Sequence, residues 1–372
     1  SLGRTPTRRR TSRLAPRMIS ITEANEGDKG RLLAFFEKNA GTDAARRMAG
    51  LWAWQWHGDP RLEQPGYRGV VAEWRGQLIG SVSCPPAGLY VHGEPLPAVW
   101  LVDVRIDWAL ARRALRDIRS DGGEREAGLS KGIAAALFDH PAAGTVQLGK
   151  HIAEPMMAIC RRIGFVTMPE AANYTRRTSV RQPLEKALGR SAGRLLAVAA
   201  DPLVVRVRRP ALNVRAFDAE FDGRFDRLWE RARSDYPAIT RRDAAVLSWR
   251  YRRHPDTVYR VFVIERDAGI RGYAVSAVVP RAGRLFARIV DLLTVKGDGE
   301  AAESLLAAAL RQCRDEGAER TDFFATGAEL IAASSRLGFA PRLTKKNKLQ
   351  PLLCRNLPDL PLYVTTGDGD GG

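Results

Sequence analysis

An internal duplication limits how this chain can fold more than any other feature of its sequence. Residues 51–60 read LWAWQWHGDP and residues 247–256 read LSWRYRRHPD, and aligning the two stretches places Trp54 opposite Trp249. Two copies of so unusual a stretch, in a chain of 372 residues, indicate two copies of one structural unit rather than a single large domain.

The two copies also share the order of their predicted elements. A short strand and an amphipathic helix precede the repeated stretch, and a β-hairpin follows it, with Gly80 opposite Gly272. Next comes an apolar strand with an acid at its middle, Asp103 in the first copy and Asp291 in the second. A helix rich in alanine and leucine, a strand and a short helix ending at Gly-Phe complete each copy. Strands that alternate with helices in this way predict an α/β fold, present twice.

The spacing between these landmarks predicts where the domains begin and end. The strand acid and the closing glycine lie 61 residues apart in the first copy and 47 in the second, so the first copy carries about 14 extra residues, expected within 108–123. The predicted segments are a disordered basic extension at 1–17, a first domain at 18–178, a linker helix with an extended segment at 179–210, a second domain at 211–345, and a C-terminal tail at 346–372 that lies over the second domain.

Net charge and hydrophobicity say less about the class of protein than the duplication does. The net charge is +17, and six arginines with no acid lie in residues 1–17. The other arginines fit either a solvated surface or attraction to a polyanion, so charge alone does not choose between them. No run of 18 apolar residues occurs, which predicts no membrane span. We interpret the apolar positions of residues 179–210 as packing positions rather than membrane-binding ones.

Cysteines and histidines give no sign of a metal site. The four cysteines lie far apart, without the paired spacing of zinc ligands, so we expect reduced thiols, no metal and a cytoplasmic protein. The histidines show no ligand spacing either. His57 and His254 are offset by two positions when the tryptophans are aligned, so a shared catalytic role is not expected.

The order and the duplication of these elements resemble the GCN5-related N-acetyltransferase (GNAT) superfamily in a tandem two-domain form. The resemblance covers nearly all of residues 18–345 and depends on the order of short motifs rather than on any one of them. It implies, in each domain, a mixed central β-sheet that splays open between its fourth and fifth strands and is flanked by helices. It also implies that acetyl-CoA or another acyl-CoA lies in this gap and donates its acyl group to an amine.

A loop of the form Arg/Gln-x-x-Gly-x-Gly/Ala, just ahead of a helix, holds the cofactor in that superfamily. Residues 125–130 read REAGLS and are the matching stretch of the first copy, with a serine at the last position as a departure from the pattern. A turn that opens a helix points free N–H groups and the positive end of the helix dipole at a pyrophosphate. An ordinary loop with a helix cap is the alternative. The resemblance thus implies a set of cofactor contacts from this loop and the fourth strand, namely Val104, Arg105, Arg125, Gly128, Leu129 and Ser130.

The second copy differs at the corresponding place. It carries Asp298 and Glu300 where the first copy has Arg125, and two acids would repel a diphosphate. We therefore expect the second copy to bind no cofactor and to serve as a scaffold or as a wall of the acceptor site.

Acyl transfer to an amine needs a base for the amine, a hydrogen-bond donor for the thioester oxygen and a proton for the leaving thiolate. The resemblance implies a backbone N–H donor on the fourth strand, at Val104 or Arg105. Asp103 and Asp107 share one side of a regular strand and are candidate bases, unless they pair with neighbouring arginines. Cys160 stands where the superfamily usually has a tyrosine acid and could donate a proton, although a buried thiol is more often inert packing.

These features predict an acyltransferase acting from acyl-CoA on a small-molecule or peptide amine. A FemAB-like transferase, taking its acyl group from aminoacyl-tRNA, is one alternative, and tRNA would be a partner only in that case. A non-catalytic protein with two degenerate copies, holding an anionic partner through its arginines, is the other. The recurring aromatic pair, Trp54 and Trp56 with its counterparts Trp249 and Tyr251, could line an acceptor pocket, but we favour packing in the core and between the domains.

Overall fold

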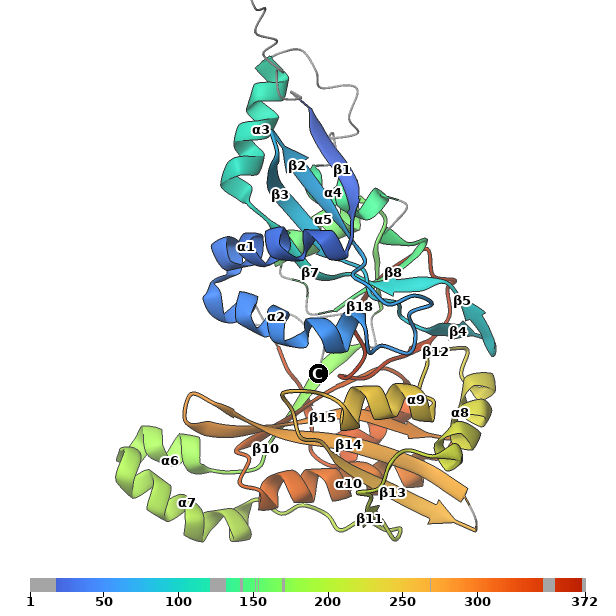
Figure 1. Ribbon diagram of the computed structural model, residues 1–372. Helices are drawn as coiled ribbons and strands as arrows, with labels where there is room; N and C mark the ends of the chain where they lie inside the picture. The colour runs from blue at the N-terminus through green and yellow to red at the C-terminus, as the bar shows by residue number, and fades with distance from the viewer. Residues whose placement is uncertain are drawn as a thin grey trace, which may run out of the picture.

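The structure is a computed structural model that describes residues 18–120, 132–140, 143–150, 152, 154–168, 171–267, 269–343 and 352–369. The chain forms two stacked α/β lobes, the first lobe at the top of Figure 1 and the second lobe at the bottom. Each lobe has parallel and antiparallel strand pairs flanked by helices, which confirms the predicted two-copy α/β fold.

The first lobe starts with an antiparallel sheet covered by two helices. The sheet has the order β1-β2-β3-β7, formed by β1 (Ile19–Ala24), β2 (Gly69–Trp74), β3 (Gln77–Ser83) and β7 (Val102–Ile106). The helices are α1 (Lys29–Ala40) and α2 (Thr42–Trp56). Gly41 separates them because its φ of +92° interrupts the helix and favours a residue without a Cβ atom. Helix α1 buries Leu32, Phe35 and Phe36, which lie on one face at helical spacing.

A smaller sheet completes the first lobe. Its order is β6-β8-β18-β9, formed by β6 (Ala98–Trp100), β8 (Val146–Gly149), β18 (Leu352–Arg355) and β9 (Val166–Met168). The other helices of this lobe are α3 (Trp108–Ser120), α4 (Ile133–Asp139) and α5 (Glu154–Arg162), of which α3 and α4 contact β3 of the first sheet. Helix α3 lies in the stretch where we expected the extra residues of the first copy, whereas the second lobe passes from strand to helix within residues 295–298.

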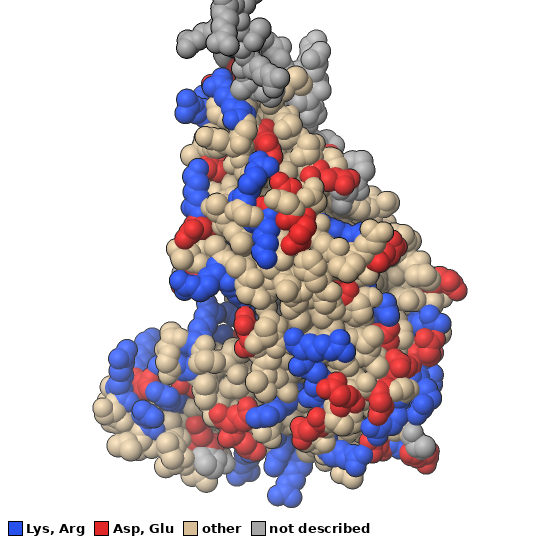
Figure 2. Space-filling view, in the orientation of Figure 1, with Lys and Arg blue, Asp and Glu red and all other residues tan. Residues whose placement is uncertain are grey.

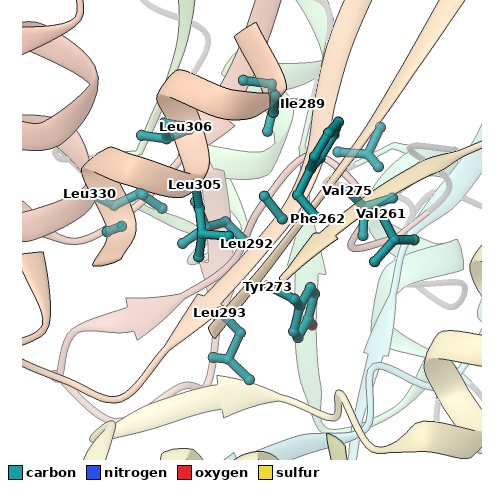
Figure 3. Packing of buried hydrophobic residues seen from close by; sticks show 14 of the residues in the cluster. Val261, Phe262, Tyr273, Val275, Ile289, Leu292, Leu293, Leu305, Leu306 and Leu330 are labelled. Carbon is teal, nitrogen blue, oxygen red and sulfur yellow. The ribbon is translucent and has the colours of Figure 1, made fainter. Parts of the chain in front are cut away.

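The second lobe has one seven-stranded sheet. Its order is β11-β13-β14-β15-β16-β10-β17, formed by β11 (Arg215–Ala216), β13 (Arg260–Arg266), β14 (Gly269–Arg281), β15 (Arg284–Thr294), β16 (Arg320–Ala325), β10 (Ala172–Arg177) and β17 (Ala340–Pro341). Its helices are α8 (Gly223–Asp235), α9 (Ala244–Leu247), α10 (Gly299–Asp315) and α11 (Ala328–Arg336). Figure 3 shows the core of this lobe, where Leu305 and Leu306 of α10 pack against Leu292 of β15 and Phe262 of β13.

The two lobes exchange one strand each. β10 belongs to the first copy by sequence, yet it pairs with β16 and β17 in the sheet of the second lobe. β18, from the end of the chain, pairs with β8 and β9 in the first lobe. The sequence predicted a tail that lies over the second domain only. In the structure the tail also contributes a strand to a sheet of the first lobe. The domain limits at 18–178 and 211–345 stay a prediction, because these strands cross between the sheets.

The repeated aromatic stretch forms part of the contact between the lobes. The indole rings of Trp54 and Trp249 stack with centroids 4.6 Å apart. Each indole N–H donates to the main-chain carbonyl of the other tryptophan, at 2.9 and 2.8 Å. The two copies of the stretch thus meet each other reciprocally. A sheet shared by both lobes adds to this contact, in the order β19-β12-β4-β5, with β19 (Leu362–Tyr363), β12 (Ala238–Thr240), β4 (Leu89–Val91) and β5 (Glu94–Leu96).

The linker between the copies is a helical hairpin of α6 (Arg181–Leu188) and α7 (Arg190–Val204), which projects beside the second lobe at the lower left of Figure 1. Its apolar positions were expected to pack, and this expectation is wrong for most of them. Leu195, Val198 and Leu203 are 75%, 73% and 72% exposed. Among the residues described, no helix has the length and hydrophobicity needed to cross a membrane.

Candidate active site

Two neighbouring strands of the first lobe separate at the place where the resemblance implies an open sheet. β6 pairs in parallel with β8 as far as Trp100 and Leu148, and the N–H of Leu101 donates to the carbonyl of Leu148 at 2.8 Å. Beyond Leu101 the same strand continues as β7 and pairs only with β3, so that it forms the edge of its sheet. A gap between β7 and β8 therefore begins next to Leu101.

The main chain of β7 is irregular where this gap begins. Asp103 has φ of +52°, a left-handed conformation that costs energy for a residue with a Cβ atom. The pairing register with β3 shifts between Ser81 and Ser83 at the same place, which is a β-bulge. Bulges of this kind re-aim side chains and often lie beside active sites. The half-buried side chain of Asp103 is consequently turned from the face that a regular strand would give it.

A cleft between the lobes opens beside this bulge. Its volume is about 470 Å³. The first lobe contributes α2 and the bulged strand, and the second lobe contributes the π-helical turn Ser248–Arg252 and the residues after it. The lining side chains used below are Phe36, Arg47, Trp54, Arg61, Asp103, Arg105, Trp249 and His254. The cleft thus combines aromatic and aliphatic walls with three guanidinium groups and two carboxylates, Asp103 and Asp43, the second of which pairs with Arg46.

Arginine side chains give one side of the cleft a positive charge. Arg61 is almost fully buried, forms a bidentate ion pair with Asp59, and lies over the Trp249 ring at 4.9 Å. Arg47 and Arg105 are exposed at the rim. Arg105 donates to the carbonyl of Val104 and lies 5.8 Å from the Phe36 ring, so its charge stays available to a ligand.

His254 lies in the cleft as a hydrogen-bond donor rather than as a base. Its Nδ1 accepts the N–H groups of Asp256 and Thr257 at 3.2 and 3.1 Å. Burial lowers the pKa of His254, and the nearby Asp256 only partly offsets that effect. The ring is therefore neutral near pH 7, and its single proton is on Nε2 because Nδ1 is the acceptor.

Asp107 has a structural role that its sequence position did not reveal. Strand β7 ends at Ile106, and Asp107 caps helix α3 by accepting the N–H of Leu110 at 2.9 Å. Its other oxygen pairs with Lys38 at 2.8 Å. Burial alone would raise the pKa of Asp107, but these two contacts outweigh it and lower the pKa. Asp103 and Asp107 do not share one side of a regular strand, since the strand bulges at one and ends before the other.

Cys160 is enclosed by the core of the first lobe. It lies on α5, is 1% exposed, and belongs to the cluster that includes Met157, Ile163 and Phe165. Burial raises the pKa of its thiol to about 11. These surroundings are those of a packing cysteine, which was the alternative interpretation of this residue.

The expected cofactor loop lies outside the described residues. Arg125, Gly128, Leu129 and Ser130 all fall within 121–131, so their positions are not known. The following helix, α4, packs on β3 at Gly80, where an added Cβ atom would lie 3.1 Å from Leu137 and 3.2 Å from Ile133. The helix that the loop should open is thus held directly against the sheet.

The corresponding gap in the second lobe is filled by the chain itself. β15 and β16 pair in parallel as far as Ile289 and Phe323, and the C-terminal segment then lies between them. Thr366 bridges the two strands, since its hydroxyl donates to the carbonyl of Ile289 and accepts the N–H of Phe324, each at 2.9 Å. Gly367 donates to the Val290 carbonyl. A cofactor could enter this gap only by displacing the segment.

Acids of the second copy are used structurally. Asp298 caps α10 by accepting the N–H of Ala301 and forms an ion pair with Arg271. Asp291, the counterpart of Asp103, is fully buried and accepts hydrogen bonds from Arg242 and Tyr273, each at 3.0 Å. Both acids of the second copy are thus engaged in structural contacts, and the expectation that this copy binds no cofactor stays a prediction. Among the described residues, no cluster of His, Cys, Asp and Glu could hold a metal ion.

Solved structures with a similar fold come from acyltransferases. A GCN5-related N-acetyltransferase from Anabaena variabilis aligns with a TM-score of 0.52 and 12% identity, over 91% of this chain and 72% of that chain. N-myristoyltransferase from Saccharomyces cerevisiae with bound myristoyl-CoA aligns with a TM-score of 0.54 and 11% identity, over 92% and 84%. A conserved Enterococcus faecalis protein of unknown function, a probable N-acyltransferase, gives 0.53 and 12%, over 91% and 72%. No family sequence profile and no curated protein sequence matches the chain.

These likenesses establish the fold. The chain has the GNAT fold in a two-lobed form over almost its whole length, as its sequence implied. Sequence reasoning did not identify Arg47, Arg61 or His254 as cleft residues. The repeated tryptophan stretch was the available signal, because it lies in the cleft wall in both copies.

Proposed function

We propose that this protein transfers an acyl group from acyl-CoA to an amine, with the first lobe holding the donor and the cleft between the lobes holding the acceptor. The observation that carries the proposal is the bulged edge strand β7, which borders both the strand gap and the cleft through Asp103. Of the two gaps, the one in the second lobe is filled by the C-terminal segment, which favours the first lobe as the donor site.

The chemical step follows from these positions. The amine nitrogen attacks the thioester carbonyl, a C–N bond forms, and the C–S bond breaks to release the CoA thiolate. Main-chain N–H groups at Val104 or Arg105 are the proposed donors to the oxygen that gains negative charge. The amine proton goes to the Asp103 carboxylate, directly or through water, and finally to the thiolate or to solvent. Cys160 is not needed as an acid, because a thiolate is already a fair leaving group.

The cleft favours an acceptor that carries an anionic group beside its amine. Arg47 and Arg105 provide positive charge at the rim, and Arg61 adds a buried guanidinium group. His254 presents a neutral donor on the same side. An amino acid or the acidic end of a peptide has this combination of a carboxylate and an amine, so we propose acceptors of that class.

Calorimetry and a thiol-release assay test the proposal together. We expect acetyl-CoA or a longer acyl-CoA to bind, and Arg125→Glu to abolish the binding, since a carboxylate there repels the diphosphate. Asp103→Asn should lower kcat by about 100-fold through loss of the base. Asp107→Asn is the matched control, and it should keep kcat within about threefold because Asn is also a good helix cap.

Other outcomes would assign another function. Salt-sensitive binding of tRNA without acyl-CoA binding would replace the proposal by an aminoacyl-tRNA-dependent transferase. Binding of neither ligand would indicate a non-catalytic protein that uses the cleft arginines for an anionic partner. Equal losses of kcat in the two aspartate variants would contradict the assignment of Asp103 as the base.

A further inference from the structure

The helical hairpin α6–α7 exposes an unusual amount of aliphatic surface. Eleven large hydrophobic residues of the described chain are exposed, and five of them lie in this hairpin. The five are Leu188, Leu195, Leu196, Val198 and Leu203. Isolated exposed apolar residues are ordinary on a protein surface, but a cluster of this kind marks a surface that contacts another apolar phase.

Helical geometry places this surface on one side of α7. Successive residues turn by about 100°, so Leu195, Val198, Ala199 and Leu203 fall on one broad arc, and all four are exposed. Gly193 and Ala197 lie on the opposite arc and are buried. Charged residues flank the exposed arc at positions 190, 194 and 201, two arginines and an aspartate, rather than interrupting it. Helix α7 therefore presents a continuous uncharged aliphatic face to the outside.

The inner side of the hairpin is fixed firmly. An added Cβ atom on Gly193 would lie 2.4 Å from the main-chain nitrogen of Glu185, so the two helices cross in close contact. Arg181 and Arg284 form a ring of ion pairs with Glu185 and Glu319, which ties α6 to the start of β15. The aliphatic face is thus held in a set orientation, and its exposure does not come from a loosely attached segment.

Three exposed cations lie beside the aliphatic face. Lys186, Arg190 and Arg194 belong to the hairpin and are exposed. Within the part of the chain that the structure describes, no carboxylate lies within ion-pair distance of these three side chains, unlike Arg181 at the base of the hairpin. In Figure 2 the hairpin, at the lower left, shows blue side chains and fewer red ones next to uncharged tan surface. Unpaired cations beside an apolar face complement an apolar layer that is bordered by anions.

We propose that the α6–α7 hairpin docks this protein onto the surface of a bilayer containing anionic phospholipids. α7 lies in the plane of the interface, with its aliphatic arc among the upper acyl chains and Lys186, Arg190 and Arg194 at the phosphate level. A bilayer suits this surface better than a protein partner does. The face is convex and purely aliphatic, whereas protein hot spots depend on aromatic and arginine anchors in fitted pockets. This inference is independent of the proposed acyl transfer.

Vesicle co-sedimentation of the full chain tests the proposal. We expect binding to mixed phosphatidylcholine and phosphatidylglycerol vesicles, little binding to phosphatidylcholine alone, and weaker binding at high salt. Val198→Glu should lower the partition coefficient by at least about tenfold, because it places a charge in the exposed aliphatic arc that would enter the acyl chains. Val258→Glu is the matched control: Val258 is 76% exposed, like Val198 at 73%, but lies outside the hairpin, and its substitution should leave binding unchanged.

Two further measurements make the result decisive. Thermal unfolding should be the same for both variants, since neither valine is buried, so a loss of binding cannot be a loss of folding. Replacing Lys186, Arg190 and Arg194 together by Gln should reduce binding to anionic vesicles only. The proposal is overturned if anionic vesicles bind no protein at low salt, or if Val258→Glu weakens binding as much as Val198→Glu does. It is also overturned if vesicles bind nothing and light scattering shows that the protein self-associates and that Val198→Glu abolishes this self-association, because the face would then contact a second copy of the chain.

Discussion

At the scale of single residues, Asp291 shows what a sequence pattern can and cannot predict. Its place on an apolar strand was evident from the sequence, as was its match to Asp103. Its partners were not, because Arg242 is 49 residues away and Thr365 is 74 residues away. The mid-strand acid of the first copy is a candidate base, whereas its counterpart in the second copy is a fully buried structural charge. Only the tertiary contacts distinguish the two cases.

The buried charges around Arg242 give a prediction about stability. Arg242 is fully buried and pairs with Asp291 and Asp368. Arg242→Met leaves the buried carboxylate of Asp291 without its cation and that of Asp368 with Arg250 alone, so we expect the free energy of unfolding in urea to fall by about 3–5 kcal/mol. Arg46→Met, which removes the exposed pair with Asp43, should change it by less than about 1 kcal/mol. Equal effects of the two substitutions would contradict this account.

The same cluster makes stability depend on acid. Burial alone would raise the pKa of Asp368, but Arg242 and Arg250 outweigh it and lower the pKa well below its usual range. A lowered pKa in the folded state means that the unfolded state binds protons more readily. The stabilisation from Asp368 is therefore complete above about pH 4 and is lost as the pH falls further. The acid-induced part of the stability loss should be smaller in Arg242→Met.

At the scale of elements, the sequence predicted the order of strands and helices better than it predicted the contacts of single residues. The order of strands and helices, the place of the additional helix α3 and the match of Gly80 to Gly272 all follow from pattern and spacing. The reason for the two glycines is visible only in the structure. Gly80 lies under α4 and Gly272 lies under α10, so each glycine lets a helix approach its sheet.

These two glycines should differ in their response to the same substitution. At Gly80 an added Cβ atom meets only side-chain ends, at 3.1 Å and beyond, so Gly80→Ala should cost about 1 kcal/mol or less. At Gly272 it would lie 2.7 Å from Thr294 and 2.9 Å from the main-chain carbonyl of Leu293, which cannot move easily. Gly272→Ala should cost about 2–3 kcal/mol in thermal or urea unfolding. The opposite order would contradict the assignment of the larger cost to the β15 main chain beside Gly272.

At the scale of the whole molecule, the exchange of strands escaped prediction for a physical reason. Each lobe has one position in its sheet that a strand from elsewhere in the chain fills, beside β8 in the first lobe and beside β16 in the second. We call these positions slots, and both offer a similar hydrogen-bonding edge. Short strands such as β10 and β18 carry too little pattern to specify which slot they enter. The choice is made by chain geometry, including the α6–α7 hairpin that follows β10. Duplication could be predicted from the sequence, but the connection between the duplicates could not.

This exchange predicts that the end of the chain stabilises both lobes at once. Truncation after residue 345 removes β18 from between β8 and β9, and it also removes the segment that bridges β15 and β16. We expect the melting temperature to fall by at least about 10 °C. Hydrogen exchange should show lost protection at Gln147 and Gly149, whose main chain faces β18 in the first lobe, and at Phe324 in the second.

A tail that only covered the second lobe would leave the amides of β8 protected after truncation, so their exchange rate decides between the two arrangements. A synthetic peptide of residues 346–372, added to the truncated chain, should restore protection in both lobes if the slots remain open. Because the strand exchange joins the sheets, protection should return in the two lobes at the same peptide concentration. Restoration in the second lobe alone would mean that the lobes are independent units, with the limits that the sequence predicted.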